Sequence, residues 1–180
     1  MSTTSSRRAM SGDSPQTWPV EAVEFTLNGV VVRVAPDPET SLLELLRDEL
    51  GCTSVKDGCS PEGSCGACTI LVDGRAQVCC AQKVAHFAGK EIVTQEGLGE
   101  ERRRLWADCF AAAGASQCGY CSPGIVMKAE GFLAKHPEPT REQIAHALLG
   151  NLCRCTGYVK IIEAVQHAAR LLATGAATRP

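Results

Sequence analysis

Residues 58–68 read GCSPEGSCGAC, and this stretch places Cys59, Cys65 and Cys68 among glycines and serines. A fourth cysteine follows after a predicted hairpin, at Cys79 or Cys80. Three closely spaced cysteines with a fourth some distance on are typical of a loop that holds a 2Fe-2S cluster, because the glycines let backbone amides turn toward the sulfurs. A zinc site is the alternative for these residues alone, since zinc also binds four thiolates.

A second set of four cysteines lies closer to the C-terminus, as the pairs Cys118-x-x-Cys121 and Cys153-x-Cys155. Ser122-Pro123 predicts a helix start directly after the first pair, and another predicted helix follows the second pair. We therefore expect both pairs at helix N-termini, where unsatisfied amides and the helix dipole favour negative charge. The Cys-x-Cys pair is too tight for a common zinc ribbon. Together the two sets predict two 2Fe-2S clusters and a role in electron transfer.

The composition argues against several other classes of protein. The 180 residues carry a formal net charge of -2 and only 4% aromatic residues, which gives little support to binding of nucleic acid or of an acidic membrane surface. No stretch approaches transmembrane length. A chain this long does not need disulfides, so its 11 cysteines favour metal ligation in a reducing compartment, and we expect a cytoplasmic protein. Arg7-Arg8 is a twin arginine, but polar residues follow where an apolar export region should stand.

Apolar alternation and turn dipeptides predict a strand-rich first half. Asn28-Gly29 and Asp73-Gly74 are favoured two-residue hairpin turns. Thr40 or Ser41 is expected to cap a leucine-rich helix that stops at Gly51. The predicted elements of this half are a hairpin over 23–34, a helix over 40–50, a hairpin over 69–80 and a last strand over 91–94.

After Gly97 the pattern changes from strands to helices. Helices are predicted over 98–113, from Ser122-Pro123 onward, from a Thr140/Gln143 capping box to Leu149, and over 158–173. We therefore predict an α+β protein in four parts. They are a flexible tail over 1–18, a first 2Fe-2S domain over 19–97, a helical 2Fe-2S domain over 98–173 and a second tail over 174–180.

Three segments carry a resemblance to a known family. They are residues 58–69, with the first three cysteines, residues 117–124, which read QCGYCSPG, and residues 150–158, which read GNLCRCTGY. On these segments the chain resembles the iron-sulfur subunit of the xanthine oxidase family of molybdenum hydroxylases. The resemblance implies a ferredoxin-like β-grasp domain followed by a four-helix domain, with one 2Fe-2S cluster in each.

The resemblance also implies an electron path and two partners. In the family, electrons leave a molybdenum-pterin centre on a large subunit, cross the helical-domain cluster and then the ferredoxin-type cluster, and reach FAD on a medium subunit. The family places two residues against the pterin, and here these are Gln117 and Cys155. Without the resemblance, Gln117 is interpreted as a helix-end residue that bonds to backbone. No catalytic residue is expected in this chain, and the substrate is expected to be selected by the large subunit.

The implied cluster ligands form two sets of four. They are Cys59, Cys65, Cys68 and Cys80, and Cys118, Cys121, Cys153 and Cys155. The family usually has four residues between the first two ligands, whereas five separate Cys59 from Cys65, which indicates a one-residue loop expansion. The spacing common in the family, eleven residues after the third ligand Cys68, selects Cys80 over Cys79, and strand alternation is expected to let only one of these two face the loop.

The sequence leaves other interpretations open. A stand-alone two-cluster ferredoxin or redox-sensing module is the alternative to an enzyme subunit, although a free plant-type ferredoxin has no use for a second cluster domain. The remaining cysteines, Cys52, Cys79 and Cys109, are expected to be small buried hydrophobes. The four histidines lack a partner pattern, and no chemistry is assigned to them.

Overall fold

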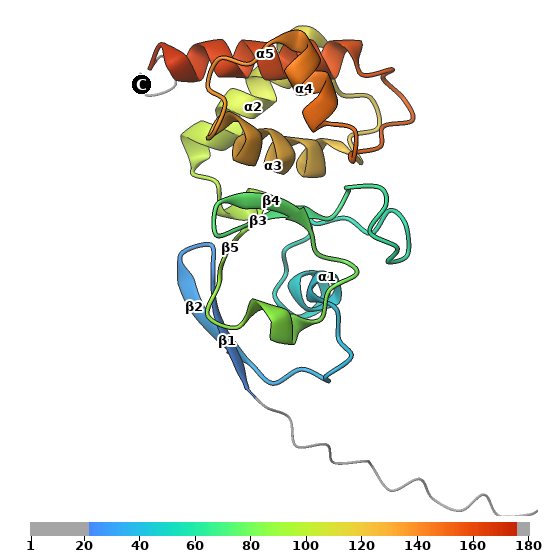
Figure 1. The fold of residues 1–180 in the computed structure, drawn as a ribbon, viewed down its shortest axis with the longest axis vertical. Coiled ribbons are helices and arrows are strands. Elements are labelled where there is room, and N and C mark those ends of the chain that lie inside the picture. The colour runs from blue at the N-terminus through green and yellow to red at the C-terminus, as the bar shows by residue number, and fades with distance from the viewer. Residues whose placement is uncertain (1–21, 176–180) are drawn as a thin grey trace, which may run out of the picture.

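The computed structural model describes residues 22–175 and arranges the strands in one mixed sheet (Figure 1). The strands are β1 (Val23–Leu27), β2 (Val30–Val34), β3 (Thr69–Val72), β4 (Arg75–Val78) and β5 (Glu91–Val93). Their order is β2-β1-β5-β3-β4, with β1 parallel to β5 and the other neighbouring pairs antiparallel. The predicted tail over 1–18 and residues 176–180 of the other tail lie outside the described residues.

Both predicted hairpins form, and each turns where its sequence favours positive φ. Asn28 and Gly29 have φ angles of 52° and 82°, and Asp73 and Gly74 have 49° and 73°. The favoured type I′ turn needs positive φ at both central residues, and Asn, Asp and Gly tolerate that conformation best. The two turn dipeptides therefore fix the register of β1 with β2 and of β3 with β4.

The leucine-rich helix of the first half is wound differently from the prediction. Ser41 caps it, because its hydroxyl accepts a hydrogen bond from the Glu44 amide at 3.2 Å. A short α1 (Leu42–Glu44) continues directly as a π-helix, Leu45–Glu49, whose hydrogen bonds span five residues. In this winding the leucines at 42, 43, 45 and 46 are all 5% exposed or less, so that four side chains of one turn and a half face the core.

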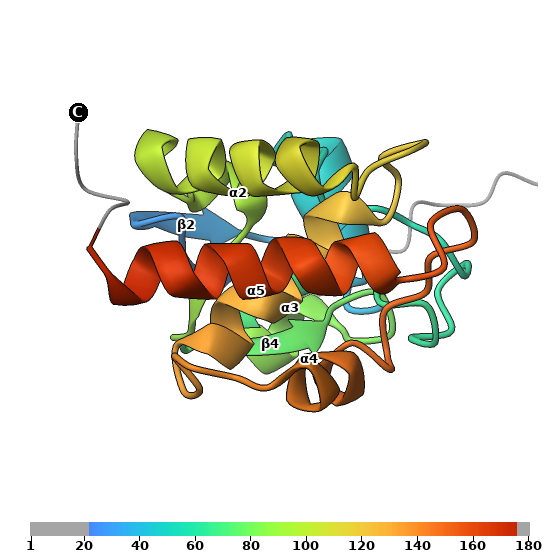
Figure 2. The same ribbon diagram turned by 90° about the horizontal axis from the view of Figure 1, so that it is seen from above.

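Four helices form the second half and lie above the sheet in Figure 1. They are α2 (Glu100–Ala113), α3 (Ser122–Leu133), α4 (Arg141–Ala147) and α5 (Val159–Ala173). The capping box of Thr140 and Gln143 is present at the start of α4, as predicted. α3 packs on β3 and β4, whereas α5 lies farthest from the sheet and packs against α2 (Figure 1 and Figure 2). The predicted α+β class is confirmed.

Each half has its own apolar core. The first core draws on residues 25–92 and the second on residues 105–169. In the second core the buried carboxylate of Glu130 accepts a hydrogen bond from the Trp106 indole and pairs with Arg102 Nε at 2.8 Å. Two separate cores support the predicted boundary near Gly97, which stays a prediction. None of the helices within residues 22–175 is both long enough and apolar enough to cross a bilayer.

Candidate metal centres

The first cysteine set lies in the loop that joins the leucine-rich helix to β3. A turn forms directly after Cys59 and is closed by a hydrogen bond from the Glu62 amide to the Cys59 carbonyl at 3.3 Å. Ser60 has a φ of 51° in this turn, and its amide donates to Asp57 Oδ1 at 2.9 Å. The additional residue between Cys59 and Cys65 is therefore accommodated by a local turn.

The thiols of Cys59 and Cys65 lie next to each other, surrounded by backbone donors. Partial desolvation raises the pKa of Cys59, but hydrogen bonds from the Cys65 and Ser64 amides outweigh it and lower that pKa to about 7. Burial raises the pKa of Cys65, whose sulfur accepts a hydrogen bond from the Ala67 amide at 3.5 Å. This loop thus aims its amides at the sulfurs, as its glycines and serines predict.

Cys68 has Cys79 and Cys80 as neighbours, and both of these thiols are buried. The hydrogen bond from the Cys79 thiol, which acts against desolvation, lowers the pKa of Cys68 to about 5. Burial, followed by the hydrogen bond with Cys68, raises the pKa of Cys80 to about 12. Cys68 therefore has two thiol neighbours, and Cys79 acts on its pKa more strongly than Cys80 does.

The choice between Cys79 and Cys80 rests on different geometry from the predicted strand alternation. β4 ends at Val78, so both cysteines lie beyond the strand and the alternation argument is wrong. The Cys79 thiol donates a hydrogen bond to the Cys68 carbonyl at 3.2 Å, which occupies it within the core. The Cys80 sulfur instead accepts from the Gly63 amide and interacts electrostatically with Cys59 across the loop. This placement favours Cys80.

The second cysteine set also brings thiols next to each other. The Cys118 and Cys155 sulfurs are 3.5 Å apart, and both residues are exposed. The Tyr120 amide, and then the Cys155 thiol, lower the pKa of Cys118, whereas the hydrogen bond to Cys118 raises that of Cys155. Cys118 and Cys155 thus share one hydrogen bond at the protein surface.

The other pair of this set is Cys121 with Cys153, and it is more enclosed. Burial, and then the hydrogen bond with Cys153, raise the pKa of Cys121 to about 12. Desolvation raises the pKa of Cys153, but hydrogen bonds from the Thr156 hydroxyl and amide outweigh it and lower that pKa. Cys118 and Cys121 lie directly before α3, as expected, although Cys121 rather than Ser122 is its N-cap. α5 begins only at Val159, so Cys153 and Cys155 do not belong to its first turn.

The two cysteine sets are joined by hydrogen bonds across the two halves of the chain. The Leu152 amide, next to a cysteine of the second set, donates to the Cys65 carbonyl at 2.8 Å. Asn151 is 3% exposed, and its Nδ2 donates to the Gly66 carbonyl at 3.0 Å and to Thr69 Oγ1 at 3.3 Å. The loop of the first set and the loop of the second are therefore held in one fixed arrangement.

Small residues make this close approach possible. A Cβ at Gly66, where φ is +70°, would overlap the Gly150 carbonyl, and a Cβ at Gly124 would overlap the Gly66 carbonyl. The Tyr120 hydroxyl donates to the Asp57 carbonyl and so adds a third link between the loops. Side chains at either glycine would push the cysteine loops apart.

Tyr158 fixes the backbone that carries Cys153. It has a φ of 68°, and its hydroxyl accepts from the Cys153 amide at 2.8 Å and donates to the Asn151 carbonyl at 2.9 Å. One phenol thus bridges both ends of the three-residue segment 151–153. The motif GNLCRCTGY contains both Asn151 and Tyr158, but the spacing of residues in the sequence does not indicate which groups these two side chains bond to.

These donor sets fit 2Fe-2S clusters in their chemistry. All 11 cysteines are free, and in each set two thiols have lowered pKa values while neighbouring thiols have raised ones. A 2Fe-2S cluster divides four thiolates between two irons, so four thiols in each set match its ligand number.

Gln117 lies beside Cys118 in the loop between α2 and α3, where it is exposed. Its side chain has no hydrogen bond within residues 22–175, and it is outside both helices, so the interpretation as a helix-end residue bonded to backbone is wrong. Cys52 and Cys109 are buried, with raised pKa values caused chiefly by desolvation, as small hydrophobes would be.

The fold and both cysteine sets have counterparts in known proteins. Residues 25–94 match the family described as "2Fe-2S iron-sulfur cluster binding domain", and residues 94–166 match "2Fe-2S binding domain". The nicotinate dehydrogenase small FeS subunit of Eubacterium barkeri is 46% identical over 147 residues, which cover 81% of this chain and 93% of that protein. The chain belongs to the iron-sulfur subunits of the xanthine oxidase family of molybdenum hydroxylases. It carries two 2Fe-2S clusters and transfers electrons within a molybdenum-dependent oxidoreductase.

Other members of the family agree in sequence and in fold. The xanthine dehydrogenase iron-sulfur-binding subunit of Escherichia coli O157:H7 is 44% identical over 146 residues, covering 79% of this chain and 91% of that one. The structure of quinoline 2-oxidoreductase from Pseudomonas putida 86 superposes with a TM-score of 0.80 at 36% identity, over 86% of this chain and 97% of that chain. In the aldehyde oxidoreductase of Desulfovibrio gigas the match covers 17% of a longer chain, at a TM-score of 0.80 and 35% identity.

Proposed function

We propose that this chain relays electrons from a molybdenum-pterin subunit, first to a cluster held by Cys118, Cys121, Cys153 and Cys155 and then to a cluster held by Cys59, Cys65, Cys68 and Cys80. The observation that carries the proposal is the grouping of free thiols in two sets, because four thiolates hold one 2Fe-2S cluster. When bound, the clusters supply one-electron carriers. The residues around them hold the thiolates and direct amides at the sulfurs.

The order of the two clusters in this relay follows from exposure. Cys118 and Cys155 are exposed, whereas Cys65, Cys68 and Cys80 are buried. Exposed large apolar side chains accompany the second set, at Tyr120, Leu149, Leu152 and Val159. Exposed apolar side chains of this kind favour contact with another subunit. The second set therefore meets the electron donor, and the first set receives electrons from the second.

Gln117 and Cys155 are proposed to face the pterin on the large subunit. Gln117 is exposed, lies next to a ligand and keeps its amide free of bonds within the described residues, so it can hydrogen-bond to a partner group. A medium FAD subunit is the proposed acceptor, reached through the first cluster, and selection of the substrate belongs to the large subunit. The free cysteines support a cytoplasmic location.

Metal analysis and spectroscopy of the purified chain test the cluster assignment. We expect about four iron and about four acid-labile sulfide per chain, with two distinct paramagnetic signals on reduction. Cys80→Ser should remove one of these signals and Cys79→Ser should retain both. Stoichiometric zinc without sulfide contradicts the assignment, and loss of the signal in Cys79→Ser alone contradicts the choice of Cys80.

Stopped-flow kinetics of the assembled complex test the role of Gln117. After substrate is added without oxygen, the clusters of the Gln117→Ala complex should be reduced more slowly than those of the unaltered complex. The reason is the loss of the proposed bond to the pterin, since a lost buried hydrogen bond costs about 1 to 3 kcal/mol. The control is Gln95→Ala, which truncates a half-buried glutamine away from the cysteines. An unchanged rate in Gln117→Ala, with assembly and both clusters intact, would remove Gln117 from the donor interface.

A further inference from the structure

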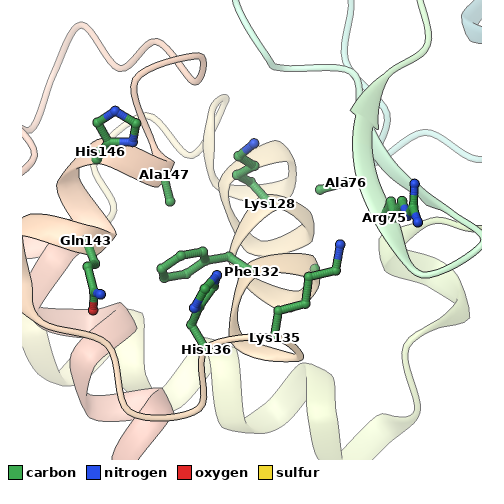
Figure 3. Close-up of a pocket in the computed structure, with 10 residues that line it drawn as sticks. Arg75, Ala76, Lys128, Phe132, Lys135, His136, Gln143, His146 and Ala147 are labelled. Carbon is green, nitrogen blue, oxygen red and sulfur yellow. The ribbon is translucent and has the colours of Figure 1, made fainter.

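A pocket of about 550 Å³ lies between α3, α4 and the β3–β4 hairpin, and no cysteine lines it. Figure 3 shows Lys128 and Phe132 along α3 and Lys135 just beyond its end, with Gln143 and His146 across from them on α4. Lys128 and Phe132 are four positions apart, so they share one face of the helix, and Lys135 follows in the turn after α3 ends at Leu133. The pocket therefore lies between α3 on one side and α4 on the other.

The charge of this pocket has one sign. Its ten lining residues include Arg75, Lys128 and Lys135 and no carboxylate, although the whole chain has a net charge of -2. Within residues 22–175 none of these three cations lies within 4.0 Å of a carboxylate, whereas Lys83 and Lys90 each have such a partner. Lys128 is half-buried, and a half-buried ammonium without a counter-ion favours binding of an anion.

The walls of the pocket are fixed before any ligand arrives. A Cβ added to Gly131 on α3 would lie 3.0 Å from the Ala76 backbone nitrogen, so the helix lies directly on β4. Gln143 Oε1 accepts from the Thr140 amide at 2.8 Å in the capping box, which sets the start of α4. A site of this kind loses little conformational entropy on binding.

The pocket also offers an aromatic surface. The rings of Phe132 and His136 have centroids 4.8 Å apart at an interplanar angle of 34°, and His136 is exposed. A flat ring of a ligand can stack on such a pair, while its anionic groups lie toward Lys128 and Lys135. A volume of about 550 Å³ is in the range of small-molecule sites.

We propose that this pocket binds a small ligand of the nucleoside phosphate class, with its phosphates at Lys128 and Lys135 and its base on the Phe132–His136 ring pair. An acidic segment of another subunit is the competing occupant. The concave shape and the ring pair favour the small molecule, because a peptide carboxylate needs the cations but not the aromatic surface. Such a site is separate from the cluster ligands and adds a ligand-binding function to the electron relay.

Calorimetric titration of the full chain with ATP, without magnesium and at low ionic strength, tests this site. We expect saturable binding of one ATP per chain, weakened roughly tenfold or more in Lys128→Gln/Lys135→Gln, because two charged contacts to phosphate are lost. The matched control, Lys83→Gln/Arg104→Gln, removes the same charge from exposed residues outside the pocket and should bind ATP within about twofold of the unaltered chain. Visible absorbance of the clusters verifies that each variant is folded.

Four outcomes would overturn the proposal. The first is an absence of saturable ATP binding, and the second is equal weakening in the pocket and control variants, which indicates general charge attraction. The third is the loss of ATP binding when the full enzyme complex is titrated, which assigns the pocket to a partner segment. Tripolyphosphate, which has no base, tests the role of the ring pair. We expect His136→Gln to weaken the binding of ATP and to leave the binding of tripolyphosphate unchanged. Equal effects on the binding of both would refute the nucleoside assignment.

Discussion

Truncation of Asn151 to alanine should loosen the contact between the two cysteine loops. Its side chain is 3% exposed and makes two hydrogen bonds, to the Gly66 carbonyl at 3.0 Å and to Thr69 Oγ1 at 3.3 Å. Neutral hydrogen bonds contribute about 0.5 to 1.5 kcal/mol each. The Gly66 carbonyl keeps its bond from Thr69 Oγ1 at 2.7 Å, so truncation leaves it partnered. We therefore expect a loss of about 2 kcal/mol rather than the larger penalty of an orphaned carbonyl.

The assay is the rate at which the visible absorbance of the clusters is lost in guanidinium without oxygen. Loss of a cofactor makes unfolding irreversible, so a rate is the appropriate measure of stability. A change of about 2 kcal/mol corresponds to roughly 30-fold faster bleaching, if the contact is broken in the transition state. Gln117→Ala is the matched control, because it removes an exposed side-chain amide that has no partner within the described residues.

A double-mutant cycle with Thr69→Val separates this contact from a general loss of packing. The bond from Asn151 Nδ2 to Thr69 Oγ1 is lost in either single substitution, and the Thr69 amide still donates to the Gly66 carbonyl at 3.2 Å when both are made, so the two effects should be less than additive. Strict additivity, or a bleaching rate of Asn151→Ala within twofold of the unaltered chain, would refute the reasoning.

Three further predictions follow from single residues. Gly66→Ala should abolish stable assembly of the first cluster, seen as loss of its paramagnetic signal, whereas Gly74→Ala, also at positive φ but in open space, should keep it. Tyr158→Phe should keep both clusters but shift the potential of the second in a redox titration, because the Cys153 amide loses its acceptor. Desolvation raises the pKa of Glu96, but hydrogen bonds from serine and threonine outweigh it, so the pKa lies below its ordinary value of 4.5. A lowered folded-state pKa gives stability that is present above the unfolded pKa and lost as pH falls. Glu96→Gln should therefore lower the melting temperature at pH 7 and have little effect well below pH 4, and an equal effect at both would contradict this.

Local rules were sufficient for much of the fold. Two-residue turns at Asn28-Gly29 and Asp73-Gly74 and the capping box at Thr140 have short-range causes, so the sequence alone placed them. The π-helix after Glu44 and the end of β4 at Val78 were not predicted. Both depend on what packs against the segment, and apolar periodicity alone does not contain that information.

Which individual cysteines are ligands stays a prediction, but their grouping into two sets was predictable because cluster binding constrains spacing within a single loop. The residues that hold the loops together were not, because the bond from Asn151 to Gly66 joins positions 85 residues apart. The glycines at positions 66 and 124 gave a partial signal of this contact, because glycine allows a close approach of backbone. In the sequence Gly66 looks like a flexible loop residue and Gly124 lies in the predicted helix, and only the fold shows that each lies against backbone of the other half of the chain.

The same contact bears on whether this chain is a free electron carrier or part of an enzyme. A carrier that meets partners in turn needs one cluster near its surface, and a second domain could be attached loosely. Here the Leu152 amide, one residue before Cys153, is bonded to the Cys65 carbonyl, so the segments that carry the two ligand sets are directly hydrogen-bonded. Such a link fixes the separation of the two carriers and sets the rate of transfer between them. A fixed separation is useful only if electrons enter at one set and leave at the other, which is the arrangement of a relay between two larger redox subunits.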